Sequence, residues 1–311
     1  MNKFRTFIMV LHTSIWIIAS QPAMAYDQKF TAYSESLTRN LITAMRKMQA
    51  DSNNLATLCD DCQTSLQNRH IFQRAIDIDL RLNAYLRMLG QDIAGHTTLD
   101  IKPYNVEDVR QLMMNIHTKF DDYAITNNII NEHEFASLNG FDLSSNASSR
   151  NPFSTLDRIE LLLLELGSPS IQPNHVLHRA RLISRLVKNL CDTDKCSEIP
   201  TALPQAITPK RPIHVYNEAN KLIFLLKLYS DKNKIPLKGG VTILKPSSHV
   251  ITPAQVNRLC GVVLADLIAI NHLLFGPSKM EVGEPPVSAT PSLVWQQINY
   301  AKRLLESALV E

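Results

Sequence analysis

The chain has 311 residues, of which 45% are hydrophobic and 20% are charged, and its 32 basic and 29 acidic residues give a formal net charge of +3. This length suits one large domain or two small ones. The charges are nearly balanced and the basic residues are not clustered, so the composition gives no electrostatic basis for binding nucleic acid or an anionic membrane.

The N-terminal segment 1–25 has the pattern of a cleaved secretory signal peptide. Lys3 and Arg5 form a basic start, residues 6–19 are mostly apolar, and residues 23–25 read Ala-Met-Ala, a small-x-small cleavage site. The apolar run is shorter than the roughly 20 residues that span a bilayer, which favours cleavage over an uncleaved anchor. Cleavage removes Lys3 and Arg5, which lowers the net charge from +3 to +1. The segment 1–25 therefore predicts a secreted or periplasmic protein with no membrane span after signal removal.

The run Cys-Asp-Asp-Cys at 59–62 is the first candidate site for chemistry. Cys59 and Cys62 are spaced as in thiol-disulfide redox proteins, where the two sulfurs lie within bonding reach. The two intervening aspartates would raise the thiol pKa, and no strand-helix pattern of the thioredoxin kind surrounds the motif. These observations favour a structural disulfide in an exported protein. Redox chemistry at Cys59 and Cys62 is the alternative.

Residues 26–139 form an N-terminal region that the periodicity predicts to be helical. Apolar side chains recur at alternating steps of four and three residues over 71–89 and over 109–123, and residues 30–49 are amphipathic. Such steps place one apolar stripe along a helix. A Ser- and Asn-rich stretch at 140–153 is the predicted linker to a second region.

The C-terminal region, residues 154–311, contains four segments with one shared pattern. In each, a Pro stands three residues before a Val, and this Val opens an apolar stripe that continues at alternating steps of four and three. Thr252 and Thr290 precede two of these prolines, as expected for an N-cap followed by Pro at the first helical position. The pattern predicts a helical repeat with helix starts near 173, 212, 253 and 291. The four prolines are Pro173, Pro212, Pro253 and Pro291.

Together these segments predict an all-α protein, either a helical bundle or an irregular helical-repeat array of about eight helices with long irregular connections. No sheet is expected, although residues 240–244 are a short strand-like run. The connections exceed the usual helix-to-helix length of about two to eight residues. At about 3.3 Å per residue, each is long enough to return along a helix, so the repeated helices would all begin at one end. Antiparallel helices with protruding loops are the alternative.

Cys191 and Cys196 flank the polar residues Asp-Thr-Asp-Lys after the first repeated helix. We expect a local structural disulfide between them, although four cysteines also permit pairing with Cys59 or Cys62. A zinc site made of both close pairs is disfavoured, because Cys62 and Cys191 lie far apart in the sequence and because an exported protein is in an oxidising compartment.

Two residues of the third repeat stand out. Cys260 occupies a stripe position where the other repeats have Ala or Ile, which predicts a buried free thiol. Asp266 occupies a core-facing position where the other three have Leu, so its carboxylate must be neutralised or paired. We expect an Arg or Lys from another helix beside Asp266, as an ion pair that fixes helix register. A functional acid lining a cavity is the alternative.

Enzyme and metal motifs do not occur in the sequence. It has no Gly-x-Ser-x-Gly, no Gly-rich phosphate loop, no His-Glu-x-x-His and no haem-attachment motif. His175 and His214 share one repeat position, which favours a structural role over metal binding. We therefore expect no metal or cofactor, and an exported, non-enzymatic helical binding or scaffold module for a protein or small-molecule ligand. The alternatives are the thiol redox protein and a cofactor-binding helical bundle.

Overall fold

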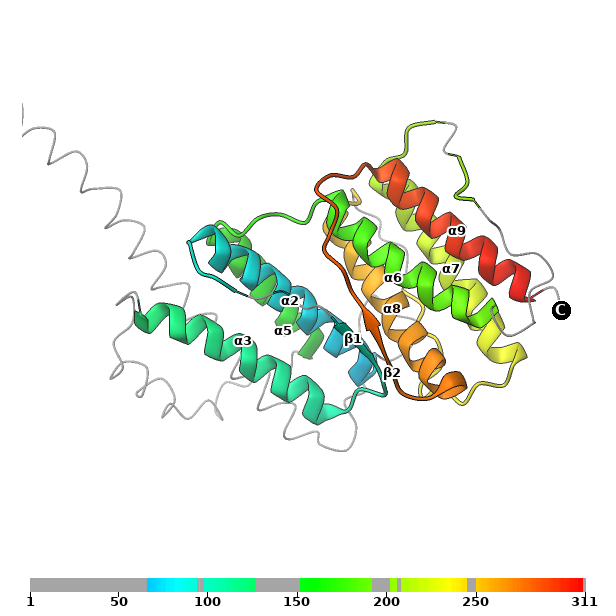
Figure 1. The fold of residues 1–311 in the computed structure, drawn as a ribbon, viewed down its shortest axis with the longest axis horizontal. Coiled ribbons are helices and arrows are strands. Elements are labelled where there is room, and N and C mark those ends of the chain that lie inside the picture. Colours follow the sequence, from blue (N-terminus) through cyan, green and yellow to red (C-terminus); the bar gives the residue numbers. More distant parts are fainter. Residues whose placement is uncertain are drawn as a thin grey trace, which may run out of the picture.

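The computed structural model of the chain describes residues 66–93, 95, 98–126, 152–191, 202–205, 208–244 and 250–309. These residues form seven α-helices and one two-stranded sheet, so the protein is all-α apart from a small sheet (Figure 1). The predicted signal peptide, and the predicted linker up to residue 151, lie outside the described residues.

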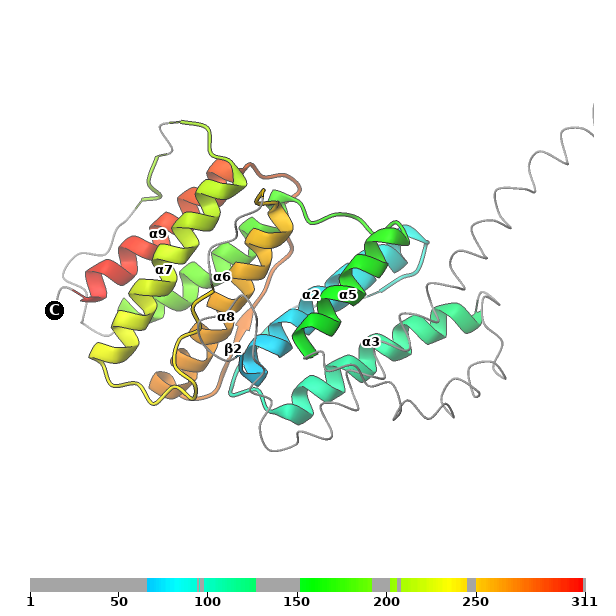
Figure 2. The same ribbon diagram turned by 180° about the vertical axis from the view of Figure 1, so that it is seen from behind.

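An N-terminal group consists of α2 (Asn68–Met88), α3 (Val106–Thr126) and α5 (Pro152–Glu165). Helix α2 packs against both α3 and α5, and apolar stripes of the three helices close a first core. The three helices run in the same direction (Figures 1 and 2). Because parallel neighbours need a connection that returns to the starting end, long connections follow from this arrangement.

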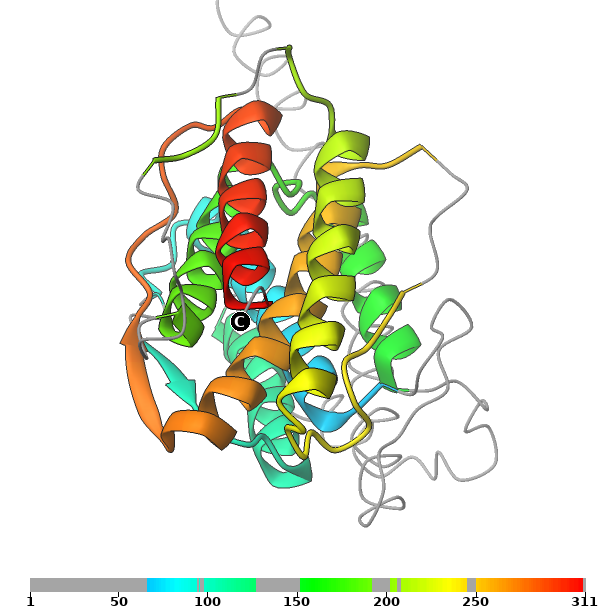
Figure 3. The same ribbon diagram turned by 90° about the vertical axis from the view of Figure 1, so that its right-hand side faces the viewer.

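A C-terminal group consists of α6 (Pro173–Cys191), α7 (Pro212–Lys232), α8 (Pro253–Phe275) and α9 (Pro291–Leu309). Helices α6 and α7 each pack against both α8 and α9 around a second, larger core. All four helices begin at the same end of the group (Figure 3), where their first turns surround one small depression. Its lining residues are Pro173, Val176, Pro212, Val215, Pro253, Val256, Pro291 and Val294.

Two of the long connections meet as a sheet. Strand β1 (Thr98–Ile101) lies between α2 and α3, and strand β2 (Ser278–Glu281) lies between α8 and α9. They pair antiparallel, with Thr98 opposite Glu281. The expectation of no sheet is therefore wrong at these residues. Each strand has four residues, too few for a clear alternating pattern, and the strand-like run at 240–244 lies in neither of them.

Five helices share one way of capping their first turn. In α2, α6 and α7 the backbone N–H of the N-cap residue donates to Nδ1 of a histidine three residues later, namely His70 (2.8 Å), His175 (3.0 Å) and His214 (2.9 Å). Gln255 in α8 and Asp108 in α3 accept the same bond at 2.8 Å. This is one half of a capping box, and it gives these histidines a structural role.

The two groups meet along α2 and α8. Arg69 contacts Asp266 near the start of α2, whereas Asp77 contacts Asn257 a few turns later, so the two helices run in opposite directions. Among the described helices, α8 alone is long and apolar enough to span a membrane, and 67% of its most apolar window is buried inside the molecule. That burial is the behaviour of a core helix.

Candidate functional site

The cysteine predictions fall largely outside the described residues. Cys59, Cys62 and Cys196 are not among them, so both the redox pair and the disulfide pairing stay predictions. Cys191 is buried at the end of α6, with Sγ 3.1 Å from the carbonyl oxygen of Leu304 in α9.

Cys260 is a buried free thiol in α8. Burial raises its pKa to about 12. Because the thiolate is the reactive form and the side chain has no access to solvent, Cys260 acts as a small core residue rather than as a nucleophile.

Asp266 is also buried, with 1% of its surface exposed. Its Oδ1 accepts hydrogen bonds from Arg69 Nε (2.7 Å) and from His70 Nε2 (2.8 Å), and its Oδ2 accepts one from the Thr242 backbone N–H (2.8 Å). Burial acts to raise the pKa of Asp266, but His70, Arg69 and the backbone donor outweigh it and hold the pKa below its ordinary value. The carboxylate is ionised, and its cationic partner comes from α2.

The geometry fixes the tautomer of His70. The Gln67 backbone N–H donates to Nδ1, so Nδ1 carries the lone pair and Nε2 carries the proton that is donated to Asp266. Burial lowers the pKa of His70, and this effect exceeds the opposing effect of Asp266. The imidazole is therefore neutral and uses both of its nitrogens.

Arg69 connects Asp266 to the connection that follows α7. We call residues 233–244 of this connection the strap. Arg69 donates from Nη1 to the Lys238 carbonyl (2.8 Å) and from Nη2 to the Gly240 carbonyl (2.7 Å). Gly239 and Gly240 have φ values of +76° and +67°, which glycine adopts without the strain that a Cβ brings. The strap is thus fastened to α2 and, through Thr242, to α8.

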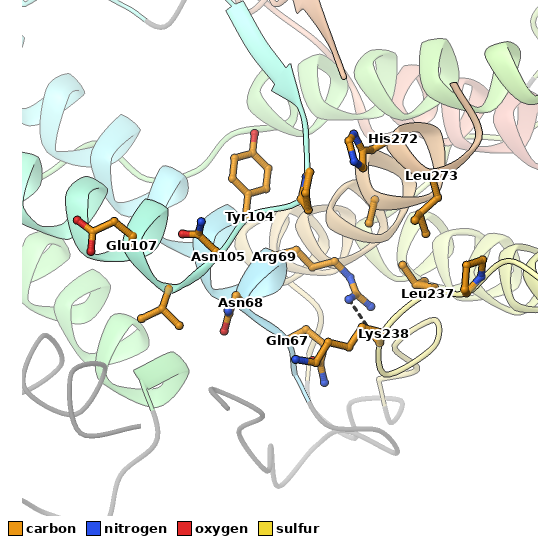
Figure 4. Close-up of a pocket in the computed structure, with 14 residues that line it drawn as sticks. Gln67, Asn68, Arg69, Tyr104, Asn105, Glu107, Leu237, Lys238, His272 and Leu273 are labelled. Atoms are coloured by element: carbon orange, nitrogen blue, oxygen red, sulfur yellow. Dashed lines mark hydrogen bonds between the residues drawn. The ribbon is translucent and has the colours of Figure 1, made fainter. Parts of the chain in front are cut away.

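A cleft of about 520 Å³ opens beside this junction (Figure 4). Its walls come from four separate segments: the start of α2, the start of α3 with the residues before it, the strap, and the last turns of α8. This volume lies within the range of about 300–1,000 Å³ that is usual for small-molecule sites. The lining residues are Gln67, Asn68, Arg69, Pro103, Tyr104, Asn105, Val106, Glu107, Pro236, Leu237, Lys238, Ala269, His272 and Leu273.

Tyr104 forms a rigid wall of the cleft. Its ring stacks on Phe72 with centroids 3.8 Å apart, and its hydroxyl donates to the Asp100 carbonyl at 2.6 Å. Burial raises the pKa of Tyr104, so the phenol stays protonated. His272 of α8 is one of the polar residues that line the cleft. Its buried Nδ1 has no hydrogen-bond partner among the described residues.

A second polar cluster lies deeper, where α2 meets α5, α6 and α8. Arg74 forms ion pairs with Asp157 and Glu160 of α5, and Arg179 of α6 forms one with Asp77 of α2. Burial acts to lower the pKa of Arg74, but the surrounding carboxylates raise it above its ordinary value. These charges are mutually satisfied, which is the behaviour of a structural joint.

Among the described residues no group of three or more His, Cys, Asp or Glu side chains is suited to hold a metal ion. No protein-family model, curated protein or solved structure matches the chain. The sequence pattern indicates Asp266 but not the cleft residues, because these come from four segments that are remote from one another in the sequence.

Proposed function

We propose that the protein is an exported, non-enzymatic binding module that holds a small-molecule ligand in the cleft beside Arg69. The observation that carries the proposal is the construction of the cleft. Four remote segments form its walls, and hydrogen bonds of Arg69 join the start of α2 to the strap and, through Asp266, to α8. A pre-formed, partly apolar cavity with a few polar groups is the usual form of a ligand site. Export is proposed on the signal pattern of residues 1–25.

The chemistry of the cleft supports binding over catalysis. None of its described lining residues is a Ser, Thr or Cys that a base would activate. The nearby carboxylate and imidazole, Asp266 and His70, are buried and engaged in holding the strap and the helix cap. We further propose that α6–α9 form an internal helical repeat that serves as the rigid scaffold on which the cleft is built.

Two fluorescent aromatic probes test the proposal. One is N-phenyl-1-naphthylamine, which is uncharged, and the other is its sulfonated relative 1-anilinonaphthalene-8-sulfonate. The full chain without its leader should bind at least one probe saturably. Ala269→Trp fills the cleft from α8 and should abolish this binding. Ala202→Trp, at an exposed position outside the cleft, is the matched control and should bind as the native protein does.

Circular dichroism of both variants verifies that they are folded. Saturable binding that survives Ala269→Trp would place the probe elsewhere and contradict the proposal. Failure of the native protein to bind either probe would contradict it as well.

A further inference from the structure

The charges of the cleft do not cancel. Arg69, Glu107 and Lys238 are the ionic side chains among its described lining residues. Arg69 is balanced by Asp266, and Glu107 is bonded to Arg110 on the next turn of α3 at 2.8 Å. Hydrogen bonding from Arg110 lowers the pKa of Glu107, so this pair stays ionised and internally neutral.

Lys238 is the third ionic side chain of the described lining residues, and it is not paired in this way. Its side chain is exposed on the strap and forms no ion pair with any described residue, while its backbone carbonyl is held by Arg69. The side chain therefore starts from a fixed point of the wall and has no counter-charge in the part of the chain that the structure describes. Electrostatic complementarity calls for an anionic group on the ligand.

The helix ends at the cleft also favour an anionic ligand. Helix α2 begins at Asn68 and α3 at Val106, and both residues line the cleft, so two helix N-termini with their partial positive charge face it. Helix α8 ends nearby with the opposite sign, so two of these three helix ends favour an anion and one opposes it. The fixed dipoles thus support the preference set by Lys238.

Apolar side chains form part of the cleft wall, and apolar surface continues beyond the rim. Tyr104 and Leu237 provide apolar wall surface, and Leu273 is 44% exposed at the cleft. The next two residues of α8, Leu274 and Phe275, are 42% and 46% exposed. A ligand with an apolar body would bury this surface, whereas a small inorganic anion would leave it in water.

From these observations we infer that the ligand of this cleft is an amphipathic organic anion, with one acidic group against Lys238 and an apolar body against Tyr104, Leu237 and Leu273. The inference rests on the proposed function of the cleft. Among the described lining residues Lys238 is the one cation without an ion pair, and the chain is nearly neutral. These features match one acidic group rather than a polyanion, which needs many Lys and Arg contacts.

The two probes separate this inference from the function on which it rests, since they share an aromatic body and differ by one sulfonate. At about pH 7.5, where Lys is charged, the native protein should bind the sulfonated probe about tenfold more tightly than the neutral one, as expected for one charge-assisted contact. Lys238→Gln should remove this preference, so that the two probes bind with similar affinity.

Lys234→Gln is the matched control, because Lys234 is exposed on the same strap and does not line the cleft. It should keep the native preference for the sulfonated probe. Added salt should weaken binding of the sulfonated probe alone. Equal affinity of the native protein for both probes, or a preference that survives Lys238→Gln, would overturn the inference while leaving a binding cleft. Binding of neither probe would overturn the proposed function itself.

Discussion

Asp266 stands where the equivalent positions of α6, α7 and α9 hold leucine. The carboxylate replaces an apolar contact by three hydrogen bonds, which come from Arg69, His70 and the strap. A buried ion pair contributes little net stability compared with a well-packed apolar pair, but removing one partner leaves the other buried and uncompensated. The residue therefore sets which surface of α8 faces α2 and where the strap lies.

Replacing Asp266 tests this role. Asp266→Leu introduces the leucine found at the equivalent positions of α6, α7 and α9. It leaves the Arg69 guanidinium and the Thr242 N–H without the carboxylate that accepts from them. The free energy of unfolding should fall by about 3–5 kcal/mol, measured by urea denaturation. Asp231→Leu is the control, since Asp231 is 61% exposed in its ion pair with Lys227 and its removal should cost less than about 1 kcal/mol. A neutral effect of Asp266→Leu would contradict the pairing.

His70 predicts a pH dependence of stability. Burial holds its folded pKa below the ordinary value of 6.5, so the folded protein favours the neutral imidazole. This contribution is fully present above pH 6.5 and is lost progressively as the pH falls toward the folded pKa. His70→Gln keeps a cap acceptor of the kind that Gln255 provides in α8, but it does not titrate.

The measurement is urea denaturation of both proteins between about pH 5 and pH 7.5. The native protein should lose more stability on acidification than His70→Gln does. The control is His214→Gln, because His214 makes the same cap bond at an exposed position. This variant should follow the native pH profile, and parallel profiles for all three proteins would contradict the assignment.

At the scale of the elements, α2 begins in the same way as α6. Residues 67–75 read QNRHIFQRA and residues 172–180 read QPNHVLHRA, with Gln at the N-cap, His as the cap acceptor and an apolar residue directly after it in both. The apolar stripe over 71–89 predicts a helix there, but its likeness to α6 is hidden because Asn68 stands where the four predicted repeats have proline. The cap acceptor three residues after the N-cap is the feature that α2 shares with α6, α7 and α8.

The same comparison explains what the sequence predicts well and what it does not. The apolar stripes and Pro173, Pro212, Pro253 and Pro291 predicted the helix content and four helix starts, because both signals are local. The pairing of β1 with β2 and the composition of the cleft depend on where long connections cross. A segment as short as β1 has no period that would indicate a partner near the other end of the chain.

The strap depends on its glycines. Gly240 has φ +67° and open space around its Cα, so Gly240→Ala tests backbone conformation without a clash. An alanine in this left-handed conformation should lower stability by about 1–2 kcal/mol. It should also speed hydrogen exchange of the Thr242 amide, which bonds to Asp266. Gly283→Ala is the control, because Gly283 has no positive φ and no neighbour within 4 Å of an added Cβ. Equal exchange in both variants would contradict the need for glycine at position 240.

At the scale of the whole molecule, two helix groups with separate cores are joined by a polar interface. Arg179 of α6 pairs with Asp77 of α2 and donates to the Asn257 carbonyl of α8 at 2.9 Å. Gly261 leaves room for this arginine, since a Cβ there would lie 3.1 Å from its Nη1. One buried guanidinium therefore connects three helices from both groups.

Arg179→Met should weaken this joint, because the buried Asp77 carboxylate loses its ion pair with α6 and keeps only the longer one to Arg74 of its own helix, at 3.8 Å. Trp295 in α9 is the only tryptophan once the predicted leader with Trp16 is removed, so its fluorescence reports the C-terminal group, whereas far-ultraviolet circular dichroism reports all helices. In the native protein the two signals should change together in urea, as in a two-state transition. In Arg179→Met the dichroism should begin to fall at a lower urea concentration than the fluorescence, because the N-terminal group has the smaller core and loses its support first.

Arg185→Met, at an exposed position of the same helix, is the control and should keep the transitions coincident. Coincident transitions in Arg179→Met would show that the groups unfold as one unit without the joint.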